Sequence, residues 1–293
     1  ADMYLGAVTG GALAPGRPTD KDTLGDGLMA GYSFQIDLNT SFTGEDSLDI
    51  SLDAGNTSAT TLGFAEFDGN ATGDALNVDG VSYTFPLGDK TTVIVGDNTD
   101  GSALFTTACA YGGPSDTLDD CGNVNAGITN GGAMVGASYD FGNGLTTAVG
   151  YAAGESDMAT GLMTKETLDA YGVNAAYTGD NYGFSVTYGL VETSSADEDT
   201  YTAFNGYYAP EGLPSISVGY EIGEDGSVTD KTADELTSFF VGLQWDEFGP
   251  GTAGVAVGTK TPTVEKTDEQ YMYEAYYSYP INDGMTITPL VFI

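Results

Sequence analysis

The amino-acid sequence predicts an all-β protein, a transmembrane antiparallel β-barrel that forms a single domain over residues 1–293. Three observations predict this fold class: apolar and polar residues alternate along many short runs, the connections between these runs alternate in length, and aromatic residues gather beside the shorter connections. No stretch approaches the roughly 18 consecutive apolar residues of a membrane-spanning helix. A closed barrel is the other structure that satisfies every backbone polar group in lipid, so residence in a membrane requires one.

The alternating runs define the strands. In residues 32–39, Tyr32, Phe34, Ile36 and Leu38 take one set of alternate positions, and polar residues take the other. Successive side chains point to opposite faces of a strand, so such a run has one apolar and one polar face. The pattern returns in residues 47–54, 81–85, 135–141, 145–151, 171–177, 182–190, 216–222, 239–245, 253–257 and 271–279. A soluble sandwich alternates in the same way, so alternation alone does not place the chain in a membrane.

The connections between the strands indicate that the chain lies in a membrane. Tight turns with an aromatic residue beside them fall at residues 43–46, 87–90, 142–144, 179–181, 210–212, 249–251 and 281–284. Longer polar connections lie between them, at about residues 56–75, 99–131, 156–165, 192–200, 224–232 and 261–269. Short periplasmic turns, long external loops and aromatic girdles are typical of outer-membrane barrels. We therefore expect this chain in a bacterial outer membrane, surrounded by its lipid.

The number of strands is odd. Counting from residues 3–9 to residues 285–293 gives about fifteen strands, whereas bacterial single-chain barrels close with an even number. Either a closing strand lies beyond Ile293 and is absent from this chain, or the count is wrong by one. We favour the absent strand and expect sixteen strands in the intact protein.

The charge and the missing histidine exclude several functions. The chain has 43 acidic and 7 basic residues, no His, and a formal net charge of −36. Nucleic acid is excluded as a partner because it requires clustered Lys and Arg. Catalysis through Ser–His or Cys–His pairs is excluded, carboxylate pairs arise by chance among so many acids, and we expect no enzyme activity and no cofactor. An acidic surface suited to a salty habitat and an acidic pore both explain the charge.

No metal site is expected either. Two Asp-rich runs, 116–120 and 223–226, offer oxygen ligands, but neither matches the spaced twelve-residue calcium loop. The two cysteines, Cys109 and Cys121, lie in a Gly-rich and Asp-rich connection, and without His a zinc site is improbable. A disulfide is the default in an oxidising compartment, and a pair of free thiols is the alternative.

Several segments resemble the cyanobacterial outer-membrane porins, which are grouped with the carbohydrate-selective porin family. They are residues 34–56 (FQIDLNTSFTGEDSLDISLDAGN), 81–96 (VSYTFPLGDKTTVIVG), 213–220 (LPSISVGY), 240–258 (FVGLQWDEFGPGTAGVAVG) and 273–292 (YEAYYSYPINDGMTITPLVF). The resemblance implies a sixteen-stranded homotrimeric barrel for carbohydrate transport, often preceded by an S-layer homology domain that binds peptidoglycan in the cell wall. That domain is not in this sequence. Where family members frequently carry Arg or Lys, this chain has Gln35, Glu45, Asp49 and Ser51, so the basic lumen becomes neutral or acidic.

The connection 99–130 is the candidate constriction loop, because a long connection without periodicity inside a compact fold is usually functional or disordered. Its carboxylates are Asp100, Asp116, Asp119 and Asp120, and the lumen-facing strand residues are Gln35, Asp37, Asp49, Ser51, Asp53, Glu221 and Glu274. A ring of acids in a narrow passage selects cations. Glycines on the polar faces leave space for an open pore: Gly136, Gly150, Gly172, Gly219, Gly242, Gly254 and Gly258.

These features predict a porin for passive diffusion of small hydrophilic solutes and inorganic ions, with a cation preference. A structural or adhesive surface barrel with a plugged lumen is the second interpretation, and a soluble secreted β-protein is the third.

Overall fold

The computed structural model describes residues 1–7, 28–57, 66, 69–129, 131–154, 161–164, 168–228 and 234–293. Within these ranges the chain forms one antiparallel sheet of 17 strands. The strands are β1 (Asp2–Gly6), β2 (Met29–Thr40), β3 (Ser47–Gly55), β4 (Asn77–Pro86), β5 (Thr91–Asp97), β6 (Met134–Asp140), β7 (Leu145–Ala153), β8 (Asp169–Thr178), β9 (Tyr182–Glu192), β10 (Glu198–Tyr208), β11 (Ser215–Glu224), β12 (Glu235–Phe248), β13 (Gly251–Thr259), β14 (Thr263–Val264), β15 (Tyr271–Asn282), β16 (Met285–Ile287) and β17 (Leu290–Phe292).

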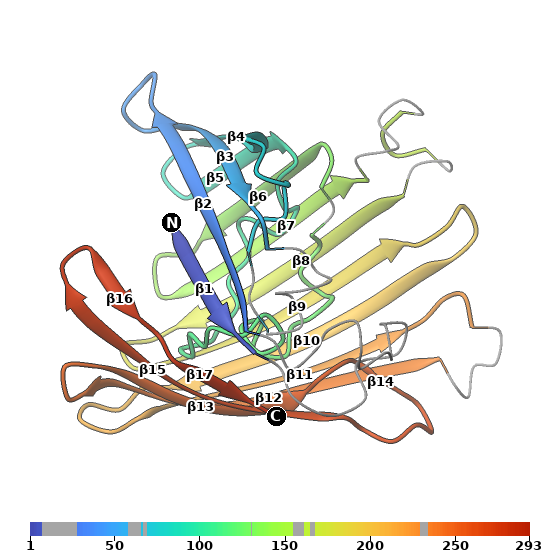
Figure 1. The fold of residues 1–293 in the computed structure, drawn as a ribbon. Helices are drawn as coiled ribbons and strands as arrows, with labels where there is room; N and C mark the ends of the chain where they lie inside the picture. Colours follow the sequence, from blue (N-terminus) through green and yellow to red (C-terminus); the bar gives the residue numbers. More distant parts are fainter. Residues whose placement is uncertain are drawn as a thin grey trace.

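The sheet is a meander that curls into a barrel (Figure 1). Each long strand pairs antiparallel with the next, from β1 against β2 to β13 against β15, and β15 then pairs with both β16 and β17. Strand β14 has two residues, and β16 and β17 are two parts of one terminal run. With β14 left out and β16 and β17 counted as one, the described sheet contains fifteen strands, the number predicted from the sequence. The sixteenth, closing strand stays a prediction.

The connections alternate in length as predicted. Short turns gather at one end of the barrel, and the connections between β9 and β10 and between β13 and β15 lie at the other end (Figure 1). In the turn between β2 and β3, the Asp46 carboxylate accepts hydrogen bonds from Ser41 Oγ (2.6 Å), Thr43 N (2.7 Å) and Tyr83 Oη (2.5 Å). These donors, Ser41 foremost, hold the pKa of Asp46 far below its usual value. Such a turn fixes the register of the strands that it joins.

Burial along the strands is the reverse of that in a soluble protein. In β11 the burial of side chains alternates over all ten residues: Ser215, Ser217, Gly219, Glu221 and Gly223 are buried, while the apolar residues between them are exposed. The same outward, exposed positions on other strands hold Ile36, Leu38, Val95, Val135, Val149, Val173, Val186 and Val255. The apolar face meets no second sheet, since the described strands form one sheet only. So large an exposed apolar surface marks a lipid or protein contact.

Aromatic side chains flank the short turns. Ring contacts join Phe42 to Tyr83, Tyr139 to Phe141, Tyr177 to Tyr182, Phe248 to Tyr277 and Tyr277 to Tyr279. They form a band at the short-turn end of the outer face, the arrangement expected of an interfacial girdle. In the described ranges no helix is long and apolar enough to span a membrane, a finding that does not bear on strands that cross as a β-barrel.

Candidate functional site

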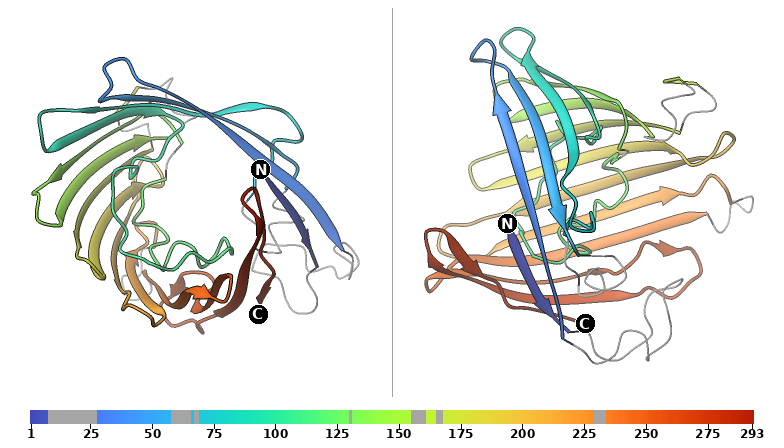
Figure 2. Two further views of the ribbon diagram at one scale, coloured as in Figure 1. Left: turned by 90° about the vertical axis from the view of Figure 1, so that its left-hand side faces the viewer. Right: turned by 45° about the horizontal axis from the view of Figure 1, so that its top comes forward.

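The connection between β5 and β6 lies inside the curled sheet. The left view of Figure 2, close to the barrel axis, shows its green trace following the inner wall. We call residues 99–129 of this connection the inner loop; they are the described part of the predicted constriction loop 99–130. Residues 106–112 form its outward limb, and residues 121–126 form its return limb. The hydrogen bonds between the two limbs and the wall reach strands β8 to β12 and β15.

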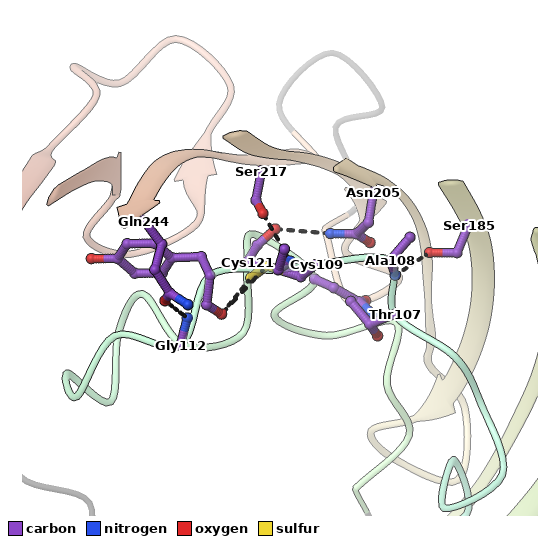
Figure 3. Close-up of a disulfide and its surroundings, with 12 residues drawn as sticks. Thr107, Ala108, Cys109, Gly112, Cys121, Ser185, Asn205, Ser217 and Gln244 are labelled. Carbon is purple, nitrogen blue, oxygen red and sulfur yellow. Dashed lines mark hydrogen bonds between the residues drawn. A yellow bond between two sulfur atoms is a disulfide. The ribbon is translucent and has the colours of Figure 1, made fainter. Parts of the chain in front are cut away.

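The outward limb is bound to the wall through alternate backbone N–H groups (Figure 3). Thr106 N donates to Asn174 Oδ1 (3.0 Å), Ala108 N to Ser185 Oγ (2.9 Å), Ala110 N to Ser217 Oγ (2.9 Å), and Gly112 N to Gln244 Oε1 (2.8 Å). The acceptors lie on β8, β9, β11 and β12, so the limb crosses the wall strand by strand. Because a buried backbone N–H without a partner is costly, these wall side chains determine where the limb can lie.

A disulfide joins the two limbs. Cys109 and Cys121 are bonded, with their Cα atoms 6.4 Å apart, which confirms the pair predicted from the sequence. Cys121 is only 1% exposed. The carbonyl oxygen of Cys121 accepts a hydrogen bond from Asn205 Nδ2 on β10 at 2.9 Å (Figure 3). The crosslink therefore lies against the wall at the middle of the inner loop.

The return limb is bound by a buried carboxylate. Glu221 on β11 is 2% exposed. Its Oε2 accepts hydrogen bonds from Asn125 N (2.9 Å) and Ala126 N (2.8 Å), and its Oε1 accepts one from Asn125 Nδ2 (2.8 Å). The sequence places Glu221 on the lumen side of its strand, and the structure adds that the inner loop covers it.

Glu274 on β15 is also covered by the inner loop. Its Oε1 accepts a hydrogen bond from Tyr111 Oη at 2.5 Å. Burial, and then this hydrogen bond, raise the pKa of Tyr111 far above its usual value, so the phenol stays a donor. Tyr111 packs against Phe240 and Tyr276 in an apolar cluster between loop and wall. Glu221, Glu274 and the buried Asp53 thus differ from the water-exposed acids that a filter requires.

Five of the seven lumen glycines make room for the inner loop, which corrects the interpretation that they leave an open pore: Gly150, Gly172, Gly219, Gly242 and Gly258. A Cβ atom at Gly150 would lie 1.9 Å from the Gly101 carbonyl oxygen, and one at Gly219 would lie 1.8 Å from that of Cys121. Side chains of the inner loop fill the space beside Gly172, Gly242 and Gly258, and Tyr276 fills the space beside Gly254; a Cβ at Gly136 would first meet Ile94, with the Gly101 carbonyl oxygen 3.8 Å away. The sequence pattern identified these positions but not their occupant.

The predicted pore residues of β2 and β3 lie away from the inner loop contacts and form their own network. Ser51 Oγ donates to Asp37 Oδ1 at 2.8 Å, and Gln35 Nε2 donates to the same oxygen at 2.7 Å. Asn39 Nδ2 donates to Asp49 Oδ1 at 2.5 Å. Gln35 and Asp37 are exposed, and Asp49 and Ser51 are partly buried. These side chains are in position to meet water on the inner face.

A cavity of about 430 Å³ lies between this part of the wall and the two ends of the inner loop. Its carboxylates are Asp49, Asp79 and Asp100, and the rest of its lining is Ser51, Gly80, Ser82, Asn98, Thr99, Thr129 and Gly131. Partial burial, and then the charge of Asp79, raise the pKa of Asp100. The other predicted acids of the loop, Asp116, Asp119 and Asp120, are exposed on the loop and make interactions of their own.

Sequence reasoning missed the acceptors that bind the inner loop, namely Asn174, Ser185, Ser217 and Gln244. Their signal was a polar residue at an inward position of its strand, which many other residues share. Within the described part of the chain, no three His, Cys, Asp or Glu side chains are grouped as metal ligands.

Comparison with known proteins supports the fold alone. No protein-family model matches the chain, and no curated protein sequence matches it. Among solved structures, a mutant of the Rhodopseudomonas blastica porin aligns with a TM-score of 0.61 and 15% identity over 92% of this chain and 88% of the porin chain. A triple mutant of that porin aligns with the same values. The fold is that of a porin. A third mutant of the same porin reaches a TM-score of 0.62 at 14% identity, with 92% of this chain and 87% of that chain aligned.

Proposed function

We propose that this protein is an outer-membrane porin that allows passive diffusion of small hydrophilic solutes and inorganic ions. The observation that carries the proposal is the inverted distribution of side chains: the apolar face is exposed outside, and the polar face surrounds a long loop inside. Outer-membrane lipid would cover the first face, and water would fill the space that the inner loop leaves free. A channel needs no catalytic group, and we propose no enzyme activity.

The passage in this proposal runs past β2, β3 and β4, where the inner loop makes fewer contacts with the wall. Asp37 and Asp49 on the wall and Asp100 at the loop base contribute negative charge from both sides. Two unit charges about 4 Å apart interact by roughly 4 kcal/mol at an effective dielectric near 20, against about 1 kcal/mol in bulk water. Same-sign charges across a narrow passage therefore favour cations, and we propose a cation preference on this basis.

Ions and small solutes fit this passage better than sugars do. Three aromatic side chains between the inner loop and the wall are covered: Tyr111 and Tyr276 are each 6% exposed, and Phe240 is 1% exposed. These three rings offer no open face on which a sugar could stack. The finer proposals, membership of the cyanobacterial carbohydrate-selective porins, a homotrimer and attachment to peptidoglycan through a further domain, rest on the resemblance of the segments quoted above.

The test is conductance in planar bilayers with the purified, folded protein. We expect discrete conductance steps, and in a salt gradient a reversal potential of the sign produced by cation flow. Folding is checked beforehand by a shift in gel migration on heating. Insertion without conductance would favour the plugged surface barrel, whereas a reversal potential of the opposite sign would refute the cation preference alone.

A further inference from the structure

The inner face of β11 contacts the inner loop at three successive positions. Ser217 accepts a hydrogen bond from Ala110 of the outward limb. Two residues on, Gly219 lies so close to the return limb that a Cβ atom there would collide with the Cys121 carbonyl oxygen at 1.8 Å. Two residues further, Glu221 accepts the backbone N–H groups of Asn125 and Ala126. Because inward positions recur every second residue, one strand holds both limbs on either side of the disulfide.

Glu221 differs from the other contacts because its charged carboxylate binds the backbone of the inner loop. The backbone N–H groups of the outward limb donate to neutral Asn, Ser and Gln oxygens, and its one hydrogen bond to a carboxylate, Glu274, comes from the Tyr111 side chain. The return limb instead donates three hydrogen bonds, two of them from backbone N–H groups, to the Glu221 carboxylate. Hydrogen bonds to an ionised acceptor are about twice as strong as neutral ones. At 2% exposure the Glu221 carboxylate is too deep to meet a passing ion. Its effect on transport must therefore act through the loop that it holds.

We propose that Glu221 is the positioning residue of the inner loop, and that it sets the width of the passage without lining it. This inference rests on the porin function proposed above. The carboxylate holds the return limb against β11, on the side away from the cavity lined by β3 and β4. The ends of the inner loop, with Asp100, border that cavity, so a return limb that leaves β11 changes both its size and its charge.

The test compares Glu221→Gln and Glu221→Ala with the unmodified chain. The alanine variant loses all three hydrogen bonds, and the glutamine variant keeps the volume and one acceptor oxygen. We expect amide exchange at Asn125 and Ala126 to become about tenfold faster in the alanine variant, the effect of losing a hydrogen bond to a charged group. Because conduction follows the pore-lining radius, we expect roughly a twofold change in conductance and a weaker cation preference. In the glutamine variant, amide exchange and conductance should lie between those of the alanine variant and those of the unmodified chain.

The matched control is Glu224→Gln, which removes the same charge at an exposed, outward position of the same strand. It should leave amide exchange and conductance unchanged. Should the alanine substitution at Glu221 prevent folding, Glu221→Gln, which keeps the side-chain volume, carries the same test of amide exchange at Asn125 and Ala126.

The possible results distinguish a failure of the positioning role of Glu221 from a failure of the porin function. A selectivity group that faced water would lower cation preference in Glu221→Gln without changing amide exchange or conductance, and that result would overturn the positioning role. Unchanged exchange at residues 125–126 in Glu221→Ala would overturn it as well. If the unmodified protein does not conduct but exchange accelerates in Glu221→Ala, the loop contact stands and the porin function fails.

Discussion

At the scale of single residues, Asp100 makes the charge of the cavity depend on pH. It borders the cavity together with Asp49 and Asp79. Partial burial and the charge of Asp79 raise the pKa of Asp100, so it binds a proton at a higher pH than the ordinary value of about 3.9. Ionised Asp100 therefore lowers the stability of the folded state, and this cost is relieved as the pH falls through the raised pKa.

We predict that the cation preference begins to fall during acidification at a higher pH than the one at which an ordinary Asp takes up a proton. Asp100→Asn should lower the preference at neutral pH and remove this first step of the profile. Asp100→Glu keeps a carboxylate and should keep the step. Reversal potentials measured across a pH series check the prediction, and an unchanged profile in Asp100→Asn would exclude Asp100 as the group that titrates.

At the scale of elements, the disulfide holds the two limbs of the inner loop together. Cys109 follows Ala108, whose N–H donates a hydrogen bond to β9. The carbonyl oxygen of Cys121 accepts a hydrogen bond from β10. In the chain-entropy model, a crosslink that closes a short loop of this kind contributes on the order of 3 kcal/mol. We expect that contribution to act on the inner loop, because neither cysteine lies in a strand of the sheet.

We predict that replacing both cysteines by serine leaves the barrel folded and loosens the inner loop. Amide exchange should accelerate at Ala108 and Ala110, and single-channel currents should become noisier. Heat-modifiable migration, which reports the barrel, should be unchanged. Loss of that migration would show instead that the barrel needs the crosslink in order to fold.

The strands were predictable from the sequence, and the contacts of the inner loop were not. Alternation along 216–222 is a local signal, since each side chain's face follows from its neighbours in sequence. The bond between Ala110 and Ser217 joins residues 107 positions apart, and that between Tyr111 and Glu274 spans 163 positions. Neither bond has a local signal. The alternation placed Glu221 and Glu274 correctly on the inner face, but their burial depends on where the inner loop lies.

The same distinction applies to the glycines of the inner face. The pattern places Gly150 and Gly219 at inward positions, and a small residue there is consistent with either an empty lumen or a close neighbour. Only the approach of the Gly101 and Cys121 carbonyl oxygens decides between these possibilities. An inward glycine therefore indicates space without showing what fills it.

At the scale of the whole molecule, the fold separates two surfaces of opposite character. The outer positions of the strands carry exposed Val, Ile, Leu and aromatic side chains, and the inner positions carry small and polar ones. In water this arrangement would expose a large apolar surface, which monomeric soluble proteins avoid. In lipid it is the stable arrangement, since every strand except those at an edge is hydrogen-bonded on both sides.

A pair of arginine substitutions tests which surface meets lipid. Val149 lies at the middle of β7, points outward, and is in register with Ala137 and Val173. Val149→Arg places a charge at mid-membrane, where it should cost about 2–4 kcal/mol. Ser51→Arg places the same charge on the inner face beside Asp37, to which Ser51 now donates a hydrogen bond, and should cost little. Urea unfolding from phospholipid vesicles measures the difference, and equal losses in the two variants would mean that the apolar face is not the one in contact with lipid.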